Sequence, residues 1–288
     1  MTRNAGDGPV AVIGATGQQG GATVEALLRA GATVRAAVRE PGAPKAAALA
    51  RRGVELARVD LSAPGSVQAL FDGAAAAFVM TTMTGPGGVD EEVANGGVIA
   101  RAAELARVPS VVYSSVGGAE RDSGVPHFDS KRRVERLLLD SVPVSFVRPT
   151  WFMENLPSKI DRADGATRVV LPLAQDVSLQ MVSVRTIGAV AAALLLAPPA
   201  PGSAVEIAGD DLTGEQIADR VAERLGAPAV LVRRAADDVD DPDQAAMWHW
   251  LNETAAYQAD RARTRTLDPD VEDLAGWLAS HRLDSPRR

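Results

Sequence analysis

The first 150 residues alternate between short apolar runs and amphipathic segments that recur about every 25–35 residues. This alternation predicts parallel strands joined by right-handed helical crossovers, and so a sheet that helices cover on both faces. We expect an α/β fold, a doubly wound parallel sheet of the Rossmann type, with its ligand beyond the carboxyl ends of the strands. The predicted strands span residues 10–14, 33–38, 54–59, 74–82, 110–114 and 144–148, and the predicted helices span 21–30, 45–52, 66–71, 91–107 and 130–140.

The alternation breaks down after residue 150, and residues 151–176 mix aromatic, proline and charged residues without a clear period. We predict a main domain over residues 1–150 and a smaller C-terminal α/β lobe over 151–288, with segments around 179–208 returning to the main domain. The lobe would cover the strand ends and complete a cleft for a small-molecule substrate or a partner. Beyond residue 200, its predicted strands span 204–208 and 229–232, and its predicted helices span 214–225, 244–258 and 271–281.

Composition excludes several classes of protein. Hydrophobic residues make up 46% of the chain and charged residues 23%, as in ordinary globular proteins. Thirty basic and 37 acidic residues give a net charge of −7, so the chain lacks the basic surface of a nucleic-acid-binding protein. The absence of cysteine excludes disulfides, thiolate ligands and cysteine nucleophiles. The histidines at 127, 249 and 281 are scattered, and we expect no metal site.

The apolar segments are too short to cross a membrane, since a spanning helix needs about 18 or more consecutive apolar residues. The longest such stretch, residues 187–199, is rich in alanine. Residues 1–9 lack the apolar core of a secretory signal. We therefore expect a cytoplasmic protein that neither enters membranes nor binds nucleic acid directly, as a monomer or a homodimer.

A glycine-rich turn follows the first predicted strand directly. Residues 14–20 read Gly-Ala-Thr-Gly-Gln-Gln-Gly, and a predicted helix comes next. Glycine lets a backbone turn sharply and approach a pyrophosphate, whose charge the free N–H groups of a helix N-terminus stabilise. A Gly-Lys-Ser/Thr sequence is missing, which favours a dinucleotide over ATP. The alternative is a glycine-rich connection that binds nothing.

Charged residues at the next strand ends bear on the identity of the dinucleotide. Arg39 ends the second predicted strand, and Arg35 shares its side of that strand. An arginine there favours the 2′-phosphate of NADP, whereas an acidic residue favours NAD. Glu40 is adjacent, so a shift of one residue would reverse the assignment. Asp60 ends the third strand, where it either flanks the adenine or is an ordinary loop residue.

Several motifs together resemble the NmrA-like family of atypical short-chain dehydrogenase/reductases. The resemblance covers nearly the whole chain and is densest over residues 10–156. The residues that carry it are the glycine turn, Arg39, His127-Phe128-Asp129-Ser130-Lys131, Arg148-Pro149, Phe152-Met153-Glu154-Asn155-Leu156, Met181-Val182-Ser183-Val184 and Leu212-Thr213.

The resemblance implies a Rossmann domain that binds NADP(H). It implies that Arg39 contacts the 2′-phosphate and that Lys131 reaches the nicotinamide ribose. Family members include reductases of quinones and other carbonyl or enone compounds, and catalytically silent regulators that sense NADP(H) and bind transcription factors. The remaining cofactor-binding candidates are Gly14, Thr16, Gly17, Gln18, Gln19, Gly20, Asp60, Thr81, Thr82 and Asn155.

The catalytic pattern departs from that of ordinary short-chain dehydrogenases, which pair a proton-donating tyrosine with a lysine in Tyr-x-x-x-Lys and add a serine. Neither tyrosine fits, because the fourth residue after Tyr113 is Gly117 and the fourth residue after Tyr257 is Arg261, where the pattern requires lysine. The matching segment is His127-x-x-x-Lys131.

Four residues are therefore catalytic candidates. His127 either donates a proton or makes a structural hydrogen bond at a helix start. Lys131 binds the ribose or serves as the acid itself. Ser114 and Ser115 take the place of the serine, or are ordinary strand-end hydroxyls.

Two functions remain open. The first is an NADPH-dependent reductase of quinones or other conjugated carbonyl compounds. The second is a binding protein that reports the NADPH/NADP ratio to a regulatory protein, which the missing tyrosine favours. An isomerase or epimerase is a distant third, because that chemistry normally requires the tyrosine.

Overall fold

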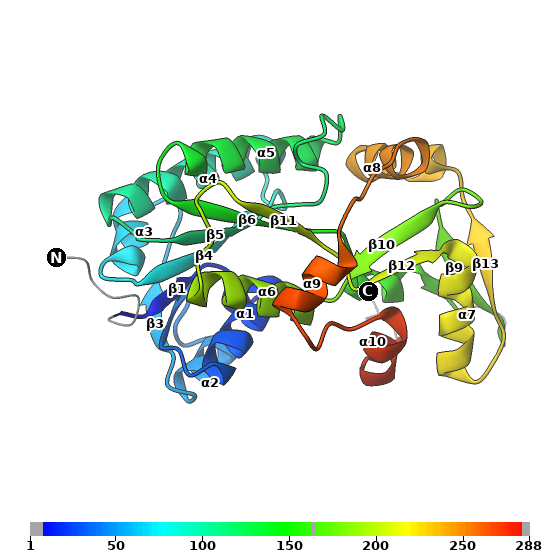
Figure 1. Cartoon of the computed structure of the whole chain (residues 1–288), viewed down its shortest axis with the longest axis horizontal. Helices are drawn as coiled ribbons and strands as arrows, with labels where there is room; N and C mark the ends of the chain where they lie inside the picture. The colour runs from blue at the N-terminus through cyan, green and yellow to red at the C-terminus, as the bar shows by residue number, and fades with distance from the viewer. Residues whose placement is uncertain (1–7, 163–164, 284–288) are drawn as a thin grey trace.

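A parallel sheet of seven strands forms the centre of the computed structural model, which describes residues 8–162 and 165–283 (Figure 1). Each neighbouring pair of strands runs parallel. The prediction of a doubly wound sheet is confirmed. In spatial order the strands are β11 (Ala204–Ile207), β6 (Val144–Pro149), β5 (Val111–Ser114), β4 (Ala76–Met80), β1 (Val10–Val12), β2 (Val34–Val38) and β3 (Glu55–Arg58).

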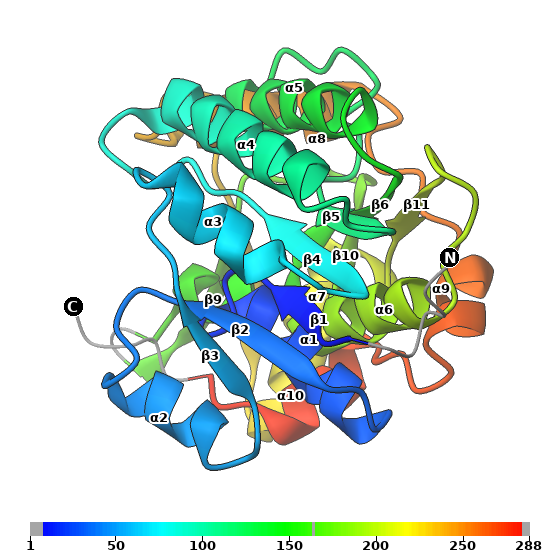
Figure 2. The same cartoon turned by 90° about the vertical axis from the view of Figure 1, so that its left-hand side faces the viewer.

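Helices cover both faces of this sheet, as the two layers in Figure 2 show. Successive side chains of a strand point to opposite faces, so Val10 and Val12 join one apolar core while Ala11 and Ile13 join the other. One layer holds α1 (Gln18–Arg29), α2 (Pro44–Ala50) and α6 (Val184–Leu196), and the other holds α3 (Pro64–Phe71), α4 (Gly88–Leu105) and α5 (Pro126–Leu139).

Several helices begin earlier in the chain than the sequence predicts, and two of these helices carry candidate site residues. Helix α1 starts at Gln18 rather than at residue 21, so the end of the glycine turn is already helical. Helix α5 starts at Pro126 rather than at residue 130. Proline suits a first helical position because its fixed φ matches the helix and its missing N–H is not needed there. His127 therefore lies in the first turn of α5.

Residues after 150 add two sheets of three strands each, in the orders β12-β10-β7 and β13-β9-β8. The sequence did not predict the strands β7, β8, β9 and β12 or the helix α9. These strands are short or lack alternation, and the helix is polar. The elements are β7 (Trp151–Phe152), η1 (Met153–Lys159), β8 (Ile160–Asp161), β9 (Thr167–Leu171), β10 (Ser178–Val182), β12 (Asp210–Thr213), α7 (Gly214–Leu225), β13 (Ala229–Arg233), η3 (Ala236–Asp238), α8 (Pro242–Glu253), α9 (Arg261–Leu267) and α10 (Leu274–Ser280).

The segments around residues 179–208 divide between the two parts. Helix α6 packs against α1, and the approach is close because a Cβ on Gly188 would lie 2.4 Å from the carbonyl carbon of Ala22. Strand β11 extends the main sheet beside β6, whereas β10 pairs with β12 and β7. The domain boundary at residue 150 stays a prediction.

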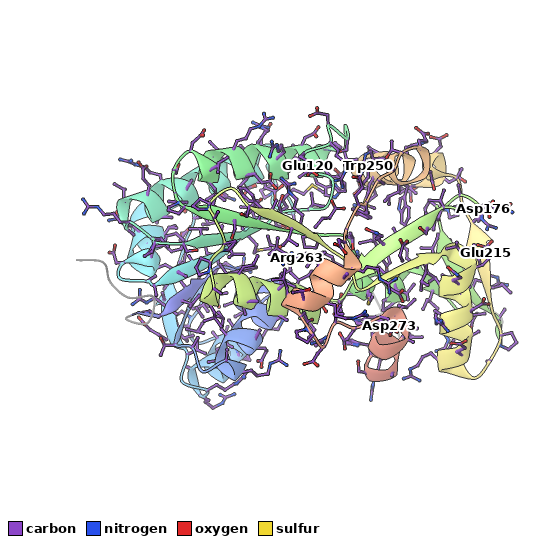
Figure 3. The ribbon with its side chains drawn as sticks, viewed as in Figure 1. Glu120, Asp176, Glu215, Trp250, Arg263 and Asp273 are labelled. Atoms are coloured by element: carbon purple, nitrogen blue, oxygen red, sulfur yellow. The ribbon has the colours of Figure 1, made fainter. Side chains whose placement is uncertain are left out.

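The second part has its own apolar core, in which Trp151, Trp248 and Trp277 are buried. Trp250 of α8 belongs to the same core and lies close to the loop that carries Glu120 (Figure 3). The guanidinium of Arg121 lies 5.9 Å from the Trp250 ring. None of the helices in the described part of the chain is long and apolar enough to span a bilayer.

Candidate functional site

The glycine turn forms an open cradle at the carboxyl end of β1. Gly14 has φ of +74°, a conformation that side chains rarely adopt, and its carbonyl accepts the N–H of Gly17 at 2.8 Å. A Cβ on Gly20 would lie 2.3 Å from that same carbonyl oxygen, so only glycine lets the turn close against α1.

The N-terminus of α1 lies open in this cradle. Gly17 is its N-cap and offers no side chain to the free N–H groups of the first turn. Uncapped N–H groups at a glycine turn bind anions, so the arrangement fits the pyrophosphate of a dinucleotide. The backbone at Gly17 has φ of −91°, a conformation that any residue can adopt.

A cavity of about 670 Å³ lies between the glycine turn and α2. Thr16, Arg39 and Lys45 are among the residues that line it, and Lys45 donates a hydrogen bond from Nζ to the carbonyl of Thr16 at 3.4 Å. Arg39 and Lys45 are exposed cations beside an anion-binding turn and suit a further phosphate group, while the exposed carboxylate of Glu40 lines the same cavity. The sequence reasoning missed Lys45, although lysine is rare in this chain and that rarity was a usable signal.

Arg35 and Asp60 have structural partners. The Arg35 guanidinium donates to Glu55 at 2.7 Å and to the carbonyls of Leu70 and Asp72, so it ties β2 to its neighbours and not to the cavity. Asp60 accepts the backbone N–H and hydroxyl of Ser62, which lowers the pKa of Asp60. These contacts support the ordinary loop role of Asp60.

Lys131 reaches the carboxyl end of β4 from α5. Its Nζ lies 2.6 Å from Oε1 of Glu92 and donates to the carbonyl of Thr81 at 2.5 Å. Glu92 is wholly buried and also accepts the hydroxyls of Thr81 and Ser130. Burial lowers the pKa of Lys131, and the charge of Glu92 opposes that change. Burial would raise the pKa of Glu92, but Lys131 and the two hydroxyls outweigh it, so that pKa is lowered.

His127 lies one helical turn before Lys131 and meets a carboxylate of α8. Its Nδ1 lies 2.6 Å from Oδ2 of Asp243, and its backbone N–H donates to Oδ1 at 2.9 Å. Burial opposes ionisation of Asp243, but the contacts with His127 outweigh it and lower the pKa of Asp243. Sequence reasoning missed Asp243, which lies 116 residues away in a segment that looks like a solvated acidic loop.

The two serines differ in their surroundings. Ser114, at the end of β5, donates its hydroxyl to Oε1 of Gln19 at 2.6 Å, which links the strand end to the glycine turn. Ser115 is buried, and its hydroxyl has no hydrogen-bond partner in the described part of the chain. Ser114 therefore lies next to the glycine turn, whereas the Ser115 hydroxyl is not tied to it by any hydrogen bond among the described residues.

The other predicted site residues are spread along the same edge of the sheet and beyond it. Thr81 is buried at the end of β4, while Thr82 is exposed and its hydroxyl lies 3.0 Å from that of Thr84. Gln18 lines a different cavity, of about 390 Å³, between α1 and α6. Asn155 is exposed on η1, and its carbonyl accepts the hydroxyl of Ser158.

Neither tyrosine lies on α5, the helix that carries Lys131. Tyr113 is wholly buried under Thr81, with 2.8 Å between the two hydroxyl oxygens, and burial raises its pKa well above the usual range. Tyr257 packs edge-on against Trp250, and burial raises its pKa as well.

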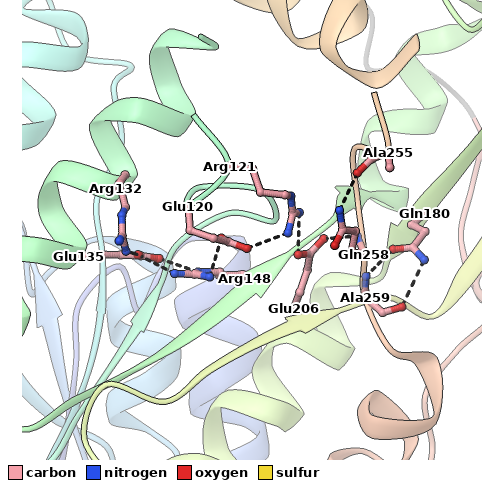
Figure 4. Close-up of polar contacts among 10 residues, drawn as sticks. All are labelled: Glu120, Arg121, Arg132, Glu135, Arg148, Gln180, Glu206, Ala255, Gln258 and Ala259. Carbon is pink, nitrogen blue, oxygen red and sulfur yellow. Dashed lines mark hydrogen bonds and ion pairs between the residues drawn. The ribbon is translucent and has the colours of Figure 1, made fainter. Parts of the chain in front are cut away.

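A chain of polar contacts joins α5 to the second part of the protein (Figure 4). It begins at Glu135 of α5, which accepts the Arg148 guanidinium of β6 at 2.9 Å. It continues through Arg121 to Glu206 of β11 and ends on β10. In order, its members are Glu135, Arg148, Glu120, Arg121, Glu206, Gln258, Ala259 and Gln180. The helix that carries His127 and Lys131 is therefore anchored at a second place.

Comparison with known proteins finds a matching family and proteins of the same fold. A model of the NmrA-like family matches residues 6–272. The NAD(P)H azoreductase of Xenophilus azovorans is 28% identical over 252 residues, which are 86% of this chain and 83% of that protein.

Two solved structures share the fold at 21% identity. One is NmrA, a negative transcriptional regulator, in complex with NADP; its TM-score is 0.81, with 96% of this chain and 95% of that one covered. The other is an NADPH-dependent quinone oxidoreductase of Escherichia coli with NADPH; its TM-score is 0.79, with 94% and 98% covered. At this identity, the likeness shows the fold alone.

Proposed function

The chain belongs to the NmrA-like family, and on that basis we propose that it is an NADPH-dependent reductase of quinones or other conjugated carbonyl compounds. The observation that carries the proposal is the continuous row of groups along one edge of the sheet. The uncapped glycine cradle, the Arg39–Lys45 cavity and the Lys131 ammonium lie at or beside the carboxyl ends of β1, β2 and β4.

The residues of this edge would hold the two halves of NADPH. The cradle at residues 14–20 would receive the pyrophosphate, and Arg39 and Lys45 would pair with the 2′-phosphate. Lys131 would contact the nicotinamide ribose, with Glu92 and Thr81 fixing the direction of its ammonium. When bound, NADPH supplies the hydride for the reduction.

The protein's own chemical task is then to deliver a proton and to orient the substrate. Two candidate acids, His127 and Lys131, lie at i and i+4 on α5 and so share one face of that helix. A positioned acid contributes about 10²–10⁴-fold to such a reaction. One relative is named an azoreductase and one protein of the same fold is named a quinone oxidoreductase. Both names support the proposal of a reductase that acts on conjugated substrates.

One observation favours a second candidate function, an NADP(H) sensor that binds a regulatory protein. Both candidate acids are already engaged by carboxylates, Lys131 by Glu92 and His127 by Asp243. The NADP-bound regulator with this fold is consistent with such a role. Tight NADPH binding without turnover, together with capture of a protein only in one redox state of the cofactor, would favour the sensor.

The decisive experiment follows NADPH oxidation by the purified protein against a panel of quinones, enones, aldehydes and azo dyes, with nucleotide binding measured by calorimetry. If the protein is such a reductase, we expect turnover with at least one conjugated substrate and tighter binding of NADPH than of NADH. Absence of turnover across the panel would contradict it.

A further inference from the structure

We infer that Asp243 is a positioning residue that holds the His127 ring, so that Nε2 of His127 is the atom that delivers the proton to the reduced substrate. The inference rests on the proposed reductase function and deepens it, because it selects one proton donor from the two candidates on α5. It also assigns a role to a residue of the second lobe.

The geometry comes first. The two carboxylate oxygens of Asp243 contact the same residue, Oδ2 at 2.6 Å from the ring Nδ1 and Oδ1 at 2.9 Å from the backbone nitrogen. The 2.6 Å separation of Nδ1 and Oδ2 is that of an ion pair, although the ring N–H is not aligned with the carboxylate oxygen as in a regular hydrogen bond. The carboxylate thus fixes both the start of α5 and the position of the ring.

Asp243 is itself held in place. It lies in the first turn of α8, where its N–H donates to the N-cap carboxylate of Asp241 at 2.9 Å, and Gln244 contacts its Oδ2. An ionised carboxylate is stabilised at a helix N-terminus by the helix dipole. The lowered pKa of Asp243, in which the contacts with His127 outweigh burial, agrees with an ionised partner for an imidazolium.

Aromatic packing fixes the plane of the ring. His127 lies edge-on to Phe128 with 4.5 Å between ring centroids, and Phe128 lies edge-on to Trp250 of α8 at 5.1 Å. The His127 side chain is still 19% exposed. Nδ1 is buried against the Asp243 carboxylate, whereas Nε2 is not buried and has no hydrogen-bond partner among the described residues, so Nε2 remains for a ligand.

The other candidate acid is committed elsewhere. Lys131 directs its ammonium to Glu92 and to Thr81. Removing its proton would leave the buried carboxylate of Glu92 without a counter-charge, which is costly. Lys131 is thus suited to binding the ribose, and His127 to proton transfer.

The proton balance is simple. Reduction of a conjugated carbonyl adds one hydride, with its electron pair, from NADPH and one proton. The Nε2–H bond breaks as the proton passes to the substrate oxygen, the imidazolium becomes neutral imidazole, and water returns a proton to Nε2. Asp243 remains ionised throughout, because it stabilises the imidazolium without accepting its proton.

The test combines kinetics with a spectroscopic measurement that needs no turnover. The variants are His127→Ala, Asp243→Asn, the combination of these two, Asp243→Ala, and Asp129→Asn as a matched control, since Asp129 is an exposed acid in the same helical turn. The Asp243→Asn substitution keeps the size of the side chain and an oxygen for the backbone N–H. Nitrogen NMR of the imidazole rings reports which ring nitrogen carries the proton in the neutral form, and the His127 signal is identified by its loss in His127→Ala.

We expect Asp243→Asn to lower kcat by at least about tenfold and to leave KM for NADPH unchanged. This loss is a part of the roughly 10²–10⁴-fold that a general acid contributes, because the variant still has the acid but no longer holds it in place. The same change in the His127→Ala background should have no further effect on kcat, because Asp243 acts through the ring. In wild-type protein the neutral ring should carry its proton on Nδ1, and in the Asp243→Ala variant on Nε2. Asp129→Asn should alter neither quantity.

An unchanged tautomer, or a loss of kcat that repeats in full in the His127→Ala background, would overturn the assignment. So would a loss of stability in Asp243→Asn without any change in kcat. If wild-type protein oxidises no NADPH with any substrate, the proposed function itself fails, and the acid role fails with it. The tautomer measurement distinguishes the two cases, because it requires neither cofactor nor substrate.

Discussion

The Nζ of Lys131 lies 2.6 Å from Oε1 of Glu92, and this carboxylate has no exposure to solvent. A buried ion pair contributes little net stability, because desolvation of both charges offsets their attraction, but removal of one partner is costly. The pair therefore holds Lys131 in one direction and makes α5 dependent on α4.

The first prediction concerns this ion pair. Glu92→Gln should lower the free energy of unfolding by about 3 kcal/mol, because it leaves the Lys131 ammonium nearly buried without a counter-charge. Urea denaturation measures the change. Glu104→Gln on the same helix is the control, since the Glu104–Arg101 pair is exposed and such pairs contribute little. Equal stability of the two variants would show that the ion pair is not needed.

The second prediction concerns acid pH. The pKa of Glu92 is lower in the folded protein than its ordinary value of 4.5, so the unfolded chain takes up the proton first as the pH falls. The contribution of Glu92 is complete above that value and is lost as the pH falls through it towards the folded pKa. In urea denaturation over a series of pH values, the stabilities of wild type and Glu92→Gln should converge below pH 4.5. Parallel curves would contradict the pairing.

The third prediction concerns cofactor preference. Arg39→Ala and Lys45→Ala should each weaken NADPH binding by about tenfold to a hundredfold, because a charge-assisted hydrogen bond to a phosphate contributes roughly 1.5–3 kcal/mol. Binding of NADH, which lacks the 2′-phosphate, should change little. Calorimetric titration of both nucleotides measures the ratio, and an equal loss for NADH would place the two cations elsewhere.

The fourth prediction compares two neighbouring glycines of α1. Gly20→Ala should destabilise the fold by about 1–3 kcal/mol and weaken NADPH binding, because the added Cβ would lie 2.3 Å from the carbonyl oxygen of Gly14. Gly21→Ala should do neither, since its Cβ would meet the Ala15 carbonyl at an ordinary 3.5 Å. Thermal unfolding and nucleotide titration of both variants measure the difference between them. Equal stability and equal NADPH affinity of the two variants would show that the turn relaxes around the added Cβ.

The fifth prediction separates the two residues of α5. Lys131→Ala should weaken NADPH binding and also lower kcat, because the side chain would touch the cofactor. His127→Ala should lower kcat by about 10²–10⁴-fold with little change in NADPH affinity. Steady-state kinetics and calorimetry give both quantities, and kcat that survives His127→Ala but not Lys131→Ala would make lysine or water the proton source.

Local patterns determined the main sheet and the cradle. Strand, glycine turn and helix follow one another within residues 10–29, so apolar patterning and glycine content predict them without reference to the rest of the chain. Arg39 is also local, since it directly follows β2. By contrast, the short strands β7 and β8 hold two residues each, too few to show a period of two, and only their pairing with β10 and β9 defines them.

Tertiary packing decided how the charged groups are used. The sequence pairs His127 with Lys131 through their four-residue spacing, but only the structure shows that Glu92 comes from another helix and that Asp243 comes from 116 residues away. Lys45 likewise meets Thr16 only because α2 folds back over the glycine turn. Helical and strand periods depend on neighbouring residues and can be inferred from the sequence, whereas the partner of a charge depends on which elements pack together, and that is settled only when the whole chain has folded.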